Sequence, residues 1–218
     1  DVLERITSAF PNILFEGCSG GGGRNDPGML YYMPQNWASD DTDAVERLYI
    51  QYGGSFVYPA STVGSHVSAV PNHQVGRITS LSMRGTVAMN GAFGYELDLS
   101  KLSEEELCEM KEQVETYKRI REIVMKGDFY RLANPFKTRY SSWMYVNADK
   151  SKAVFYYAVK QARPTREVVK IRLKGLDENA CYSVGEKEYT GKTLMNYGIT
   201  MKSEEHDCDN LMLEINRI

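Results

Sequence analysis

Residues 14–43 constrain the possible folds most, because two short strand-like pieces in this stretch each end in chemically unusual residues. The apolar run at 13–15 is followed by Cys18 and by four consecutive glycines at 20–23. A mixed aromatic run then ends at Trp37 and is followed by a cluster of three aspartates. Short strands that lead into such loops are typical of parallel α/β folds, in which neighbouring strand ends face one pocket.

Strand–loop–helix units are expected over the first part of the chain. The patterns predict helices at 2–10, 44–53 and 103–130 (as one helix or two), and strands at 13–15, 55–58 and 92–99. A long polar loop is predicted at 59–80. The helix at 44–53 is predicted to begin with Asp41 or Thr42 as its N-cap.

The sequence texture changes after residue 135, where alternating strands separated by turn signals replace the helical pattern. We therefore expect two domains, an α/β part at 1–135 and an antiparallel β-sandwich at 136–218. A complete (β/α)8 barrel needs roughly 250 residues, so the first part can supply only about three or four of its eight units. It is either a smaller α/β domain or the C-terminal part of a barrel.

Composition and charge exclude several classes of function. The net charge of -3 argues against nucleic-acid binding, and no apolar run approaches the roughly 20 residues that span a membrane. Four cysteines lack the spacing of a zinc site or a disulfide framework, which predicts reduced thiols and a cytoplasmic protein. His66 and His73 lack a third nearby ligand, so neither a metal nor another cofactor is expected. The chain opens within a helical pattern without an initiator Met, and we expect its natural N-terminus to lie elsewhere.

The glycine run at 20–23 does not have the pattern of a phosphate-binding loop. Arg24 and Asn25 stand where a Walker motif needs Lys and Ser or Thr, and Asp26-Pro27 interrupts any dinucleotide pattern. Two interpretations remain, a flexible surface loop and a backbone that approaches a ligand closely because glycine has no Cβ. In the second case Cys18 and the backbone amides that follow it line a pocket.

The three aspartates have different expected roles. Helix capping and the helix dipole explain Asp41 and Asp43. Asp40 comes earlier, at a strand end, where barrel enzymes place catalytic groups. A carboxylic acid beside Trp37 in a partly desolvated site is suited to general acid catalysis, which makes Asp40 the candidate catalytic residue.

Two stretches of the sequence resemble a known family. The run LFEGCSGGGGRNDPGMLYYMPQNWASDDTDAVERLYIQYGG and the later GYELDLSKLSEEE resemble family 36 glycoside hydrolases, the bacterial and fungal α-galactosidases. The resemblance implies the C-terminal part of a (β/α)8 catalytic barrel followed by a β-sandwich. It also implies a retaining mechanism that hydrolyses terminal α-galactosides such as melibiose and raffinose.

The resemblance also implies roles for individual residues. The first aspartate of the family's S-D-D-T-D-A segment, the acid/base, corresponds to Asp40. The CSGGGGR loop contacts galactose, and its matching positions here are Cys18, Ser19, Gly20 and Gly21. Trp37 is implied as a sugar-stacking or wall residue. Asn25 departs from the aromatic residue expected in the family's GGGRFD pattern, which affects the rim of the site more than its chemistry.

Other family features are missing from these 218 residues. The resemblance implies a nucleophile in a K-W-D motif upstream of the glycine run. It implies a separate aspartate pair, also upstream, that binds galactose hydroxyls. Because both are missing here, the chain alone is expected to be inactive. Two alternatives stay open, a galactosyl-transferring relative of raffinose synthase and a non-catalytic carbohydrate-binding or structural fragment. By analogy with long family members, a homo-oligomer, namely a tetramer, is expected.

Overall fold

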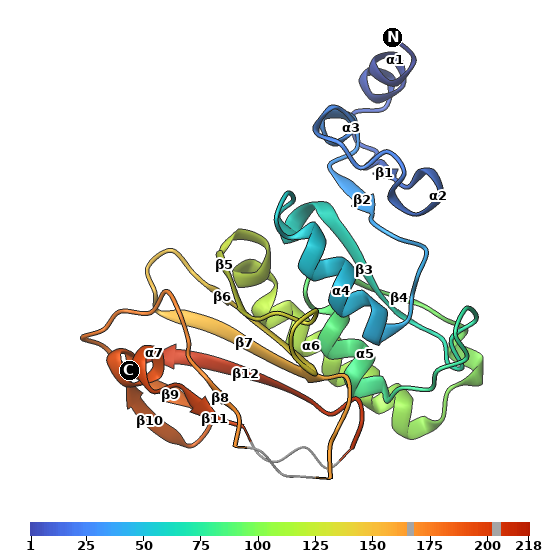
Figure 1. Cartoon of the computed structure of the whole chain (residues 1–218). Helices are drawn as coiled ribbons and strands as arrows, with labels where there is room; N and C mark the ends of the chain where they lie inside the picture. Colours follow the sequence, from blue (N-terminus) through green and yellow to red (C-terminus); the bar gives the residue numbers. More distant parts are fainter. Residues whose placement is uncertain (165–167, 202–205) are drawn as a thin grey trace.

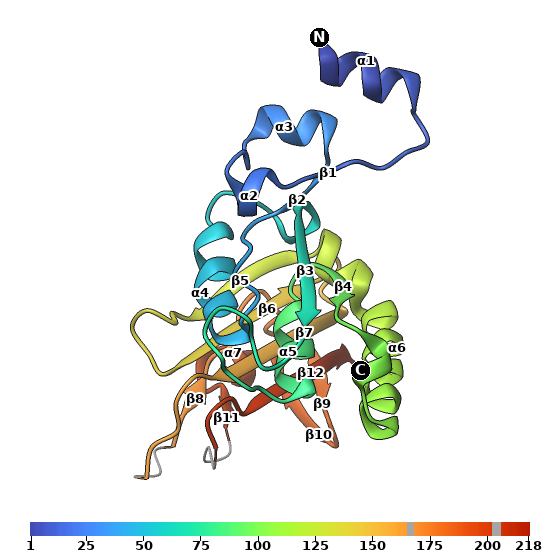
Figure 2. The same cartoon turned by 90° about the vertical axis from the view of Figure 1, so that its right-hand side faces the viewer.

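A parallel sheet organises the N-terminal part of the computed structural model, which describes residues 1–164, 168–201 and 206–218 (Figure 1). Its strand order is β1-β2-β3-β4, with bounds Glu16–Gly17, Gln35–Trp37, Val63–Ser68 and Ala92–Glu96. The helices of this part are α1 Val2–Ala9, α2 Ser19–Gly22, α3 Pro27–Tyr32, α4 Ala44–Gly54, α5 Leu81–Ala88 and α6 Glu104–Lys126. The N-terminal elements up to β2 project from the rest of the molecule in both views (Figures 1 and 2).

A six-stranded antiparallel sheet follows, in the order β10-β9-β12-β7-β6-β5. In that order its strands are Lys187–Thr190, Cys181–Val184, Asn210–Arg217, Lys152–Val159, Tyr140–Val146 and Asp128–Ala133. A separate pair, β8 Lys170–Ile171 and β11 Ile199–Thr200, and helix α7 Gly191–Asn196 complete this part. β5 already belongs to this sheet, whereas the predicted domain boundary follows residue 135. The division into domains at that residue stays a prediction.

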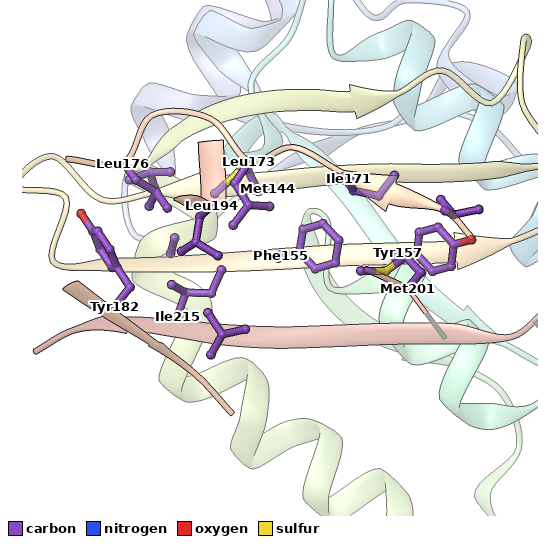
Figure 3. Packing of buried hydrophobic residues seen from close by; sticks show 14 of the residues in the cluster. Met144, Phe155, Tyr157, Ile171, Leu173, Leu176, Tyr182, Leu194, Met201 and Ile215 are labelled. Carbon is purple, nitrogen blue, oxygen red and sulfur yellow. The ribbon is translucent and has the colours of Figure 1, made fainter. Parts of the chain in front are cut away.

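Both faces of the antiparallel sheet are buried. Met144 and Val146 of β6 belong to a core with Leu173 and Leu194, and Figure 3 shows this cluster around Phe155. The alternate residues of β6 face the other way and pack in a second core with residues of α4, α5 and α6. Burying a large apolar side chain stabilises the fold by about 1.5–3 kcal/mol, so both cores hold the sheet in place. The aromatic residues Trp143, Tyr145, Phe155, Tyr156 and Tyr157 of these two strands are all buried.

Several predicted elements are confirmed. The helices predicted at 2–10 and 44–53 are α1 and α4. The helical segment predicted at 103–130 is a single helix, α6, but it ends at Lys126, and residues 128–130 belong to β5. Ser103 and Glu106 form its capping box, as the sequence indicates. The strand predicted at 92–99 is β4. Within the described residues no helix is long and apolar enough to cross a membrane.

The strand predicted at 55–58 is wrong. These residues form turns after α4, and Phe56 and Val57 are exposed. The polar loop predicted at 59–80 is also wrong in part, because it contains β3. β3 reads VGSHVS, and its small and polar residues do not form the apolar pattern that predicts a strand. Its burial depends on side chains from other elements. The strand predicted at 13–15 is displaced, since pairing with β2 starts at Glu16.

Candidate functional site

The loop after β1 turns back through left-handed backbone. Ser19 has φ 54° and Gly21 has φ 71°, and the amide of Gly22 donates to the carbonyl of Cys18 at 2.9 Å. Positive φ is costly for any residue with a Cβ, so the glycines permit this turn. Cys18, Ser19 and Gly20 are exposed on it. All four cysteines of the chain, Cys18 included, are free thiols in the structure.

The glycine turn packs directly against the loop that follows β2. A Cβ on Gly21 would lie 2.7 Å from the backbone nitrogen of Asp40 and 3.2 Å from its Oδ2. A Cβ on Gly22 would lie 2.5 Å from the carbonyl oxygen of Ala38. Distances this short leave no room for a side chain, so the absence of Cβ atoms brings the two loops together. The structure thus places Gly21, one of the predicted site residues, directly against Asp40.

The three aspartates have separate environments. Asp43 is only 2% exposed, caps α4 by accepting from the amides of Val45 at 3.1 Å and Glu46 at 3.0 Å, and pairs with Arg77. The prediction that Asp41 or Thr42 is the cap is therefore wrong, because α4 begins at Ala44 as predicted and Asp43, directly before it, is the cap. Asp41 accepts from the amide of Asp43 at 3.0 Å.

Asp40 differs from Asp41 and Asp43 in its surroundings. It is exposed, and no described residue forms a hydrogen bond or ion pair with its carboxylate. It is the third residue after the end of β2, in the loop that packs against the glycine turn. A carboxyl group that the fold does not use for capping is available for chemistry.

Replacing the buried cap tests this division of roles. Asp43→Ala should lower the free energy of unfolding by about 2 kcal/mol, because it orphans two helix amides and removes the partner of Arg77. Urea denaturation measures the change. Asp41→Asn keeps an oxygen acceptor for the Asp43 amide and should stay within about 0.5 kcal/mol of the parent. Equal losses in the two variants would contradict the assignment of Asp43 as the cap.

Trp37 is enclosed rather than open. It is 8% exposed, its ring stacks on His66 at 4.5 Å with an interplanar angle of 18°, and the Arg47 guanidinium lies 4.5 Å from its centroid. Gly64 leaves space for the ring, since a Cβ there would lie 3.3 Å from Cε3 of Trp37. This burial favours the predicted wall role over stacking on a sugar, and contact with a ligand stays a prediction.

One face of the parallel sheet carries polar residues, of which the sequence singled out only His66. Gln35 donates to Glu16 across β1 and β2, and Nδ1 of His66 lies 3.7 Å from Oε2 of Glu96 on β4. The alternation of side chains along each strand places them on the face that carries Trp37. No group of three or more His, Cys, Asp or Glu side chains that could hold a metal ion occurs in the part of the chain described.

Arg47 is a buried cation that the sequence analysis also missed. It is 3% exposed, and burial lowers the pKa of its guanidinium to about 10, although the charges of Asp41 and Glu96 act in the opposite direction. A signal was present, because Arg47 shares the buried stripe of α4 with Ala44 and Leu48. An arginine at such a position is ordinarily read as a solvated residue.

The comparisons with known proteins cover nearly all of the chain. Residues 1–127 match the melibiase family model, and residues 140–214 match the model of the glycosyl hydrolase family 36 C-terminal domain. Alpha-galactosidase AgaA of Geobacillus stearothermophilus is 53% identical over 218 residues, which is 100% of this chain and 30% of that protein. The bifunctional alpha-galactosidase/sucrose kinase AgaSK of Mediterraneibacter gnavus is 46% identical over 212 residues, 95% of this chain and 23% of that protein.

Solved structures show the same fold. The crystal structure of AgaA superposes with a TM-score of 0.98 at 53% identity, covering 100% of this chain and 30% of that one. A variant of AgaA in complex with raffinose gives a TM-score of 0.98 at 52% identity, with the same coverage. This likeness and the two sheets confirm the predicted fold class, the C-terminal part of a (β/α)8 barrel followed by an antiparallel β-sandwich. The chain spans about 30% of the length of AgaA.

Proposed function

The chain belongs to the melibiase family, glycoside hydrolase family 36, and from this membership we propose that it is the acid/base part of a retaining α-galactosidase. The complete enzyme would hydrolyse terminal α-D-galactosyl residues of melibiose- and raffinose-type oligosaccharides. The observation that carries the proposal is Asp40, an exposed carboxylate with no described partner, held against the glycine turn at a strand end. The raffinose complex of the related AgaA supports the substrate class.

A retaining glycosidase uses two carboxyl groups about 5–5.5 Å apart, one as nucleophile and the other as acid and then base. We assign the second role to Asp40. It protonates the leaving oxygen, and as a carboxylate it then takes a proton from the water that releases galactose. The nucleophile comes from outside these 218 residues, so the chain alone should not hydrolyse the substrate. Cys18, Ser19, Gly20 and Gly21 would contact the sugar, with Trp37 as a wall. This chemistry uses no cofactor.

The function is tested by following raffinose with the complete enzyme. Proton NMR should show galactose released first as the α-anomer, because double displacement retains configuration. The β-anomer as first product would contradict the retaining mechanism. Absence of galactose from raffinose, melibiose and aryl α-galactosides would contradict the proposal itself. At high acceptor concentration a new oligosaccharide in place of free galactose would identify a transferring relative.

A purely carbohydrate-binding role for the C-terminal part is less favoured. Strands β6 and β7 are buried on both faces, which leaves no open face in the middle of this sheet for a glycan. We therefore interpret the sheet as a structural support for the helices of the barrel. A homo-tetramer and a cytoplasmic location complete the proposal, and light scattering of the complete enzyme would test the tetramer.

A further inference from the structure

Arg47 lies between the Asp40 loop and the neighbouring strand. We propose that Arg47 is a positioning residue that fixes Asp40 for proton transfer by holding the carbonyl of Ser39. This inference rests on the proposed function, because it assigns Arg47 a task in the same reaction. Arg47 itself touches no reacting atom, and it acts through the backbone that carries Asp40.

The hydrogen bonds of Arg47 carry the inference. Nη1 donates to the carbonyl of Ser39 at 3.1 Å, one residue before Asp40, and Nη2 donates to the carbonyl of Gly64 at 3.1 Å. One rigid guanidinium therefore ties the loop after β2 to strand β3. The planar fork of arginine fixes both distances at once, which a single ammonium group cannot do.

This tie lies where the backbone ladder ends. β2 pairs with β3 only at Asn36↔Val63 and Trp37↔Gly64, so residues 38–40 have no strand partner. The guanidinium continues the connection from Gly64 to Ser39 beyond the last pair. On the other side, the turn at Gly21 and Gly22 presses against the same residues. The segment that carries Asp40 is thus held from both sides.

The cost of burying Arg47 indicates that it has a specific role. A buried charge is expensive unless it is fully hydrogen-bonded or paired, and no described carboxylate forms an ion pair with Arg47. An apolar side chain would fill the same space on α4 at lower cost. The alternative is that Arg47 only supports the fold, and a second buried arginine allows the two roles to be separated.

Arg84 is the matched control. It is 5% exposed on α5, and its Nη1 donates to the carbonyl of Ser68, the last residue of β3, at 2.7 Å. It thus resembles Arg47 in burial, in lying on a helix and in binding a β3 carbonyl, but none of its described hydrogen bonds reaches residues 38–40. Arg84→Met should therefore reproduce the general effect of removing a buried arginine.

The kinetic test compares Arg47→Met, Arg47→Lys and Arg84→Met in the complete enzyme. Arg47→Met should lower kcat for raffinose by about 100-fold, the usual effect of misplacing a catalytic group by about 1 Å. The loss should be under about 10-fold for an aryl galactoside whose leaving group needs little protonation. KM should change little, and Arg47→Lys should restore part of the rate. Equal losses on both substrates, as expected for Arg84→Met, would overturn the inference.

Hydrogen exchange in the complete enzyme supplies a readout that does not depend on turnover. Amides of residues 38–41 should exchange at least about 10-fold faster in Arg47→Met than in the parent. They should be unchanged in Arg84→Met. Unchanged exchange in Arg47→Met would overturn the inference even if the enzyme proves not to be a galactosidase. If Arg47→Met does not fold, the milder Arg47→Lys decides by the same two measurements.

Discussion

Replacing Asp40 by alanine in the complete enzyme should lower kcat for raffinose by about 1000-fold, within the range that general acid catalysis contributes. The leaving group of raffinose is a sugar alkoxide, which departs only when it is protonated. An aryl galactoside with an acidic phenol needs little protonation, so its glycosylation step should fall far less. Initial rates on both substrates measure the difference.

Two further variants make the Asp40 prediction specific. Asp41→Asn alters the next carboxylate along the chain and should keep kcat within a few-fold of the parent. Asp40→Ala should also leave the free energy of unfolding nearly unchanged, because Asp40 is exposed and no described residue pairs with its side chain. Unchanged turnover of raffinose by Asp40→Ala would remove the acid/base assignment altogether.

Replacing Gly21 by alanine should disable the same step from the neighbouring loop. The new Cβ would lie 2.7 Å from the Asp40 nitrogen and 3.2 Å from Oδ2, so the loop that carries Asp40 must move. A shift of about 1 Å in a catalytic group costs about 100-fold in rate. The left-handed backbone at φ 71° adds about 1–2 kcal/mol of destabilisation. Steady-state kinetics and thermal unfolding measure the two effects.

Gly76→Ala is the control that separates the steric clash with Asp40 from the loss of stability caused by a Cβ in left-handed backbone. Gly76 has φ 68°, close to that of Gly21, but a Cβ there has no atom within 4 Å. The Gly76→Ala variant should lose a similar amount of stability, and its kcat should stay unchanged. If Gly21→Ala affects kcat no more than Gly76→Ala does, the close approach of the two loops has no catalytic importance.

The elements that the sequence predicts well are those with local causes. The capping box of Ser103 and Glu106 fixes the start of α6, and simple alternation separates Trp143 from Met144 on the two faces of β6. β3 could not be found in this way. Its Gly64 is explained by Trp37, a residue of another strand, and no local pattern contains that information.

The residues of the candidate site also differ in whether the sequence alone could identify them. The sequence and the resemblance select Asp40 and the glycine turn, and the structure brings these two loops into contact. Arg47 was missed because its role depends on carbonyl groups of Ser39 and Gly64, which the fold alone brings within reach. The cap of α4 was misplaced by one or two residues because Asp41, Thr42 and Asp43 are all good capping residues.

The core shared by the two sheets has a consequence for protein engineering. Leu48, Ile120 and Tyr156, from two helices and from β7, are fully or almost fully buried in one cluster. Separating the chain between the two family-model segments would cut through that cluster and expose it to water. In chimeras between relatives, the C-terminal sheet should therefore be exchanged together with helices α4, α5 and α6.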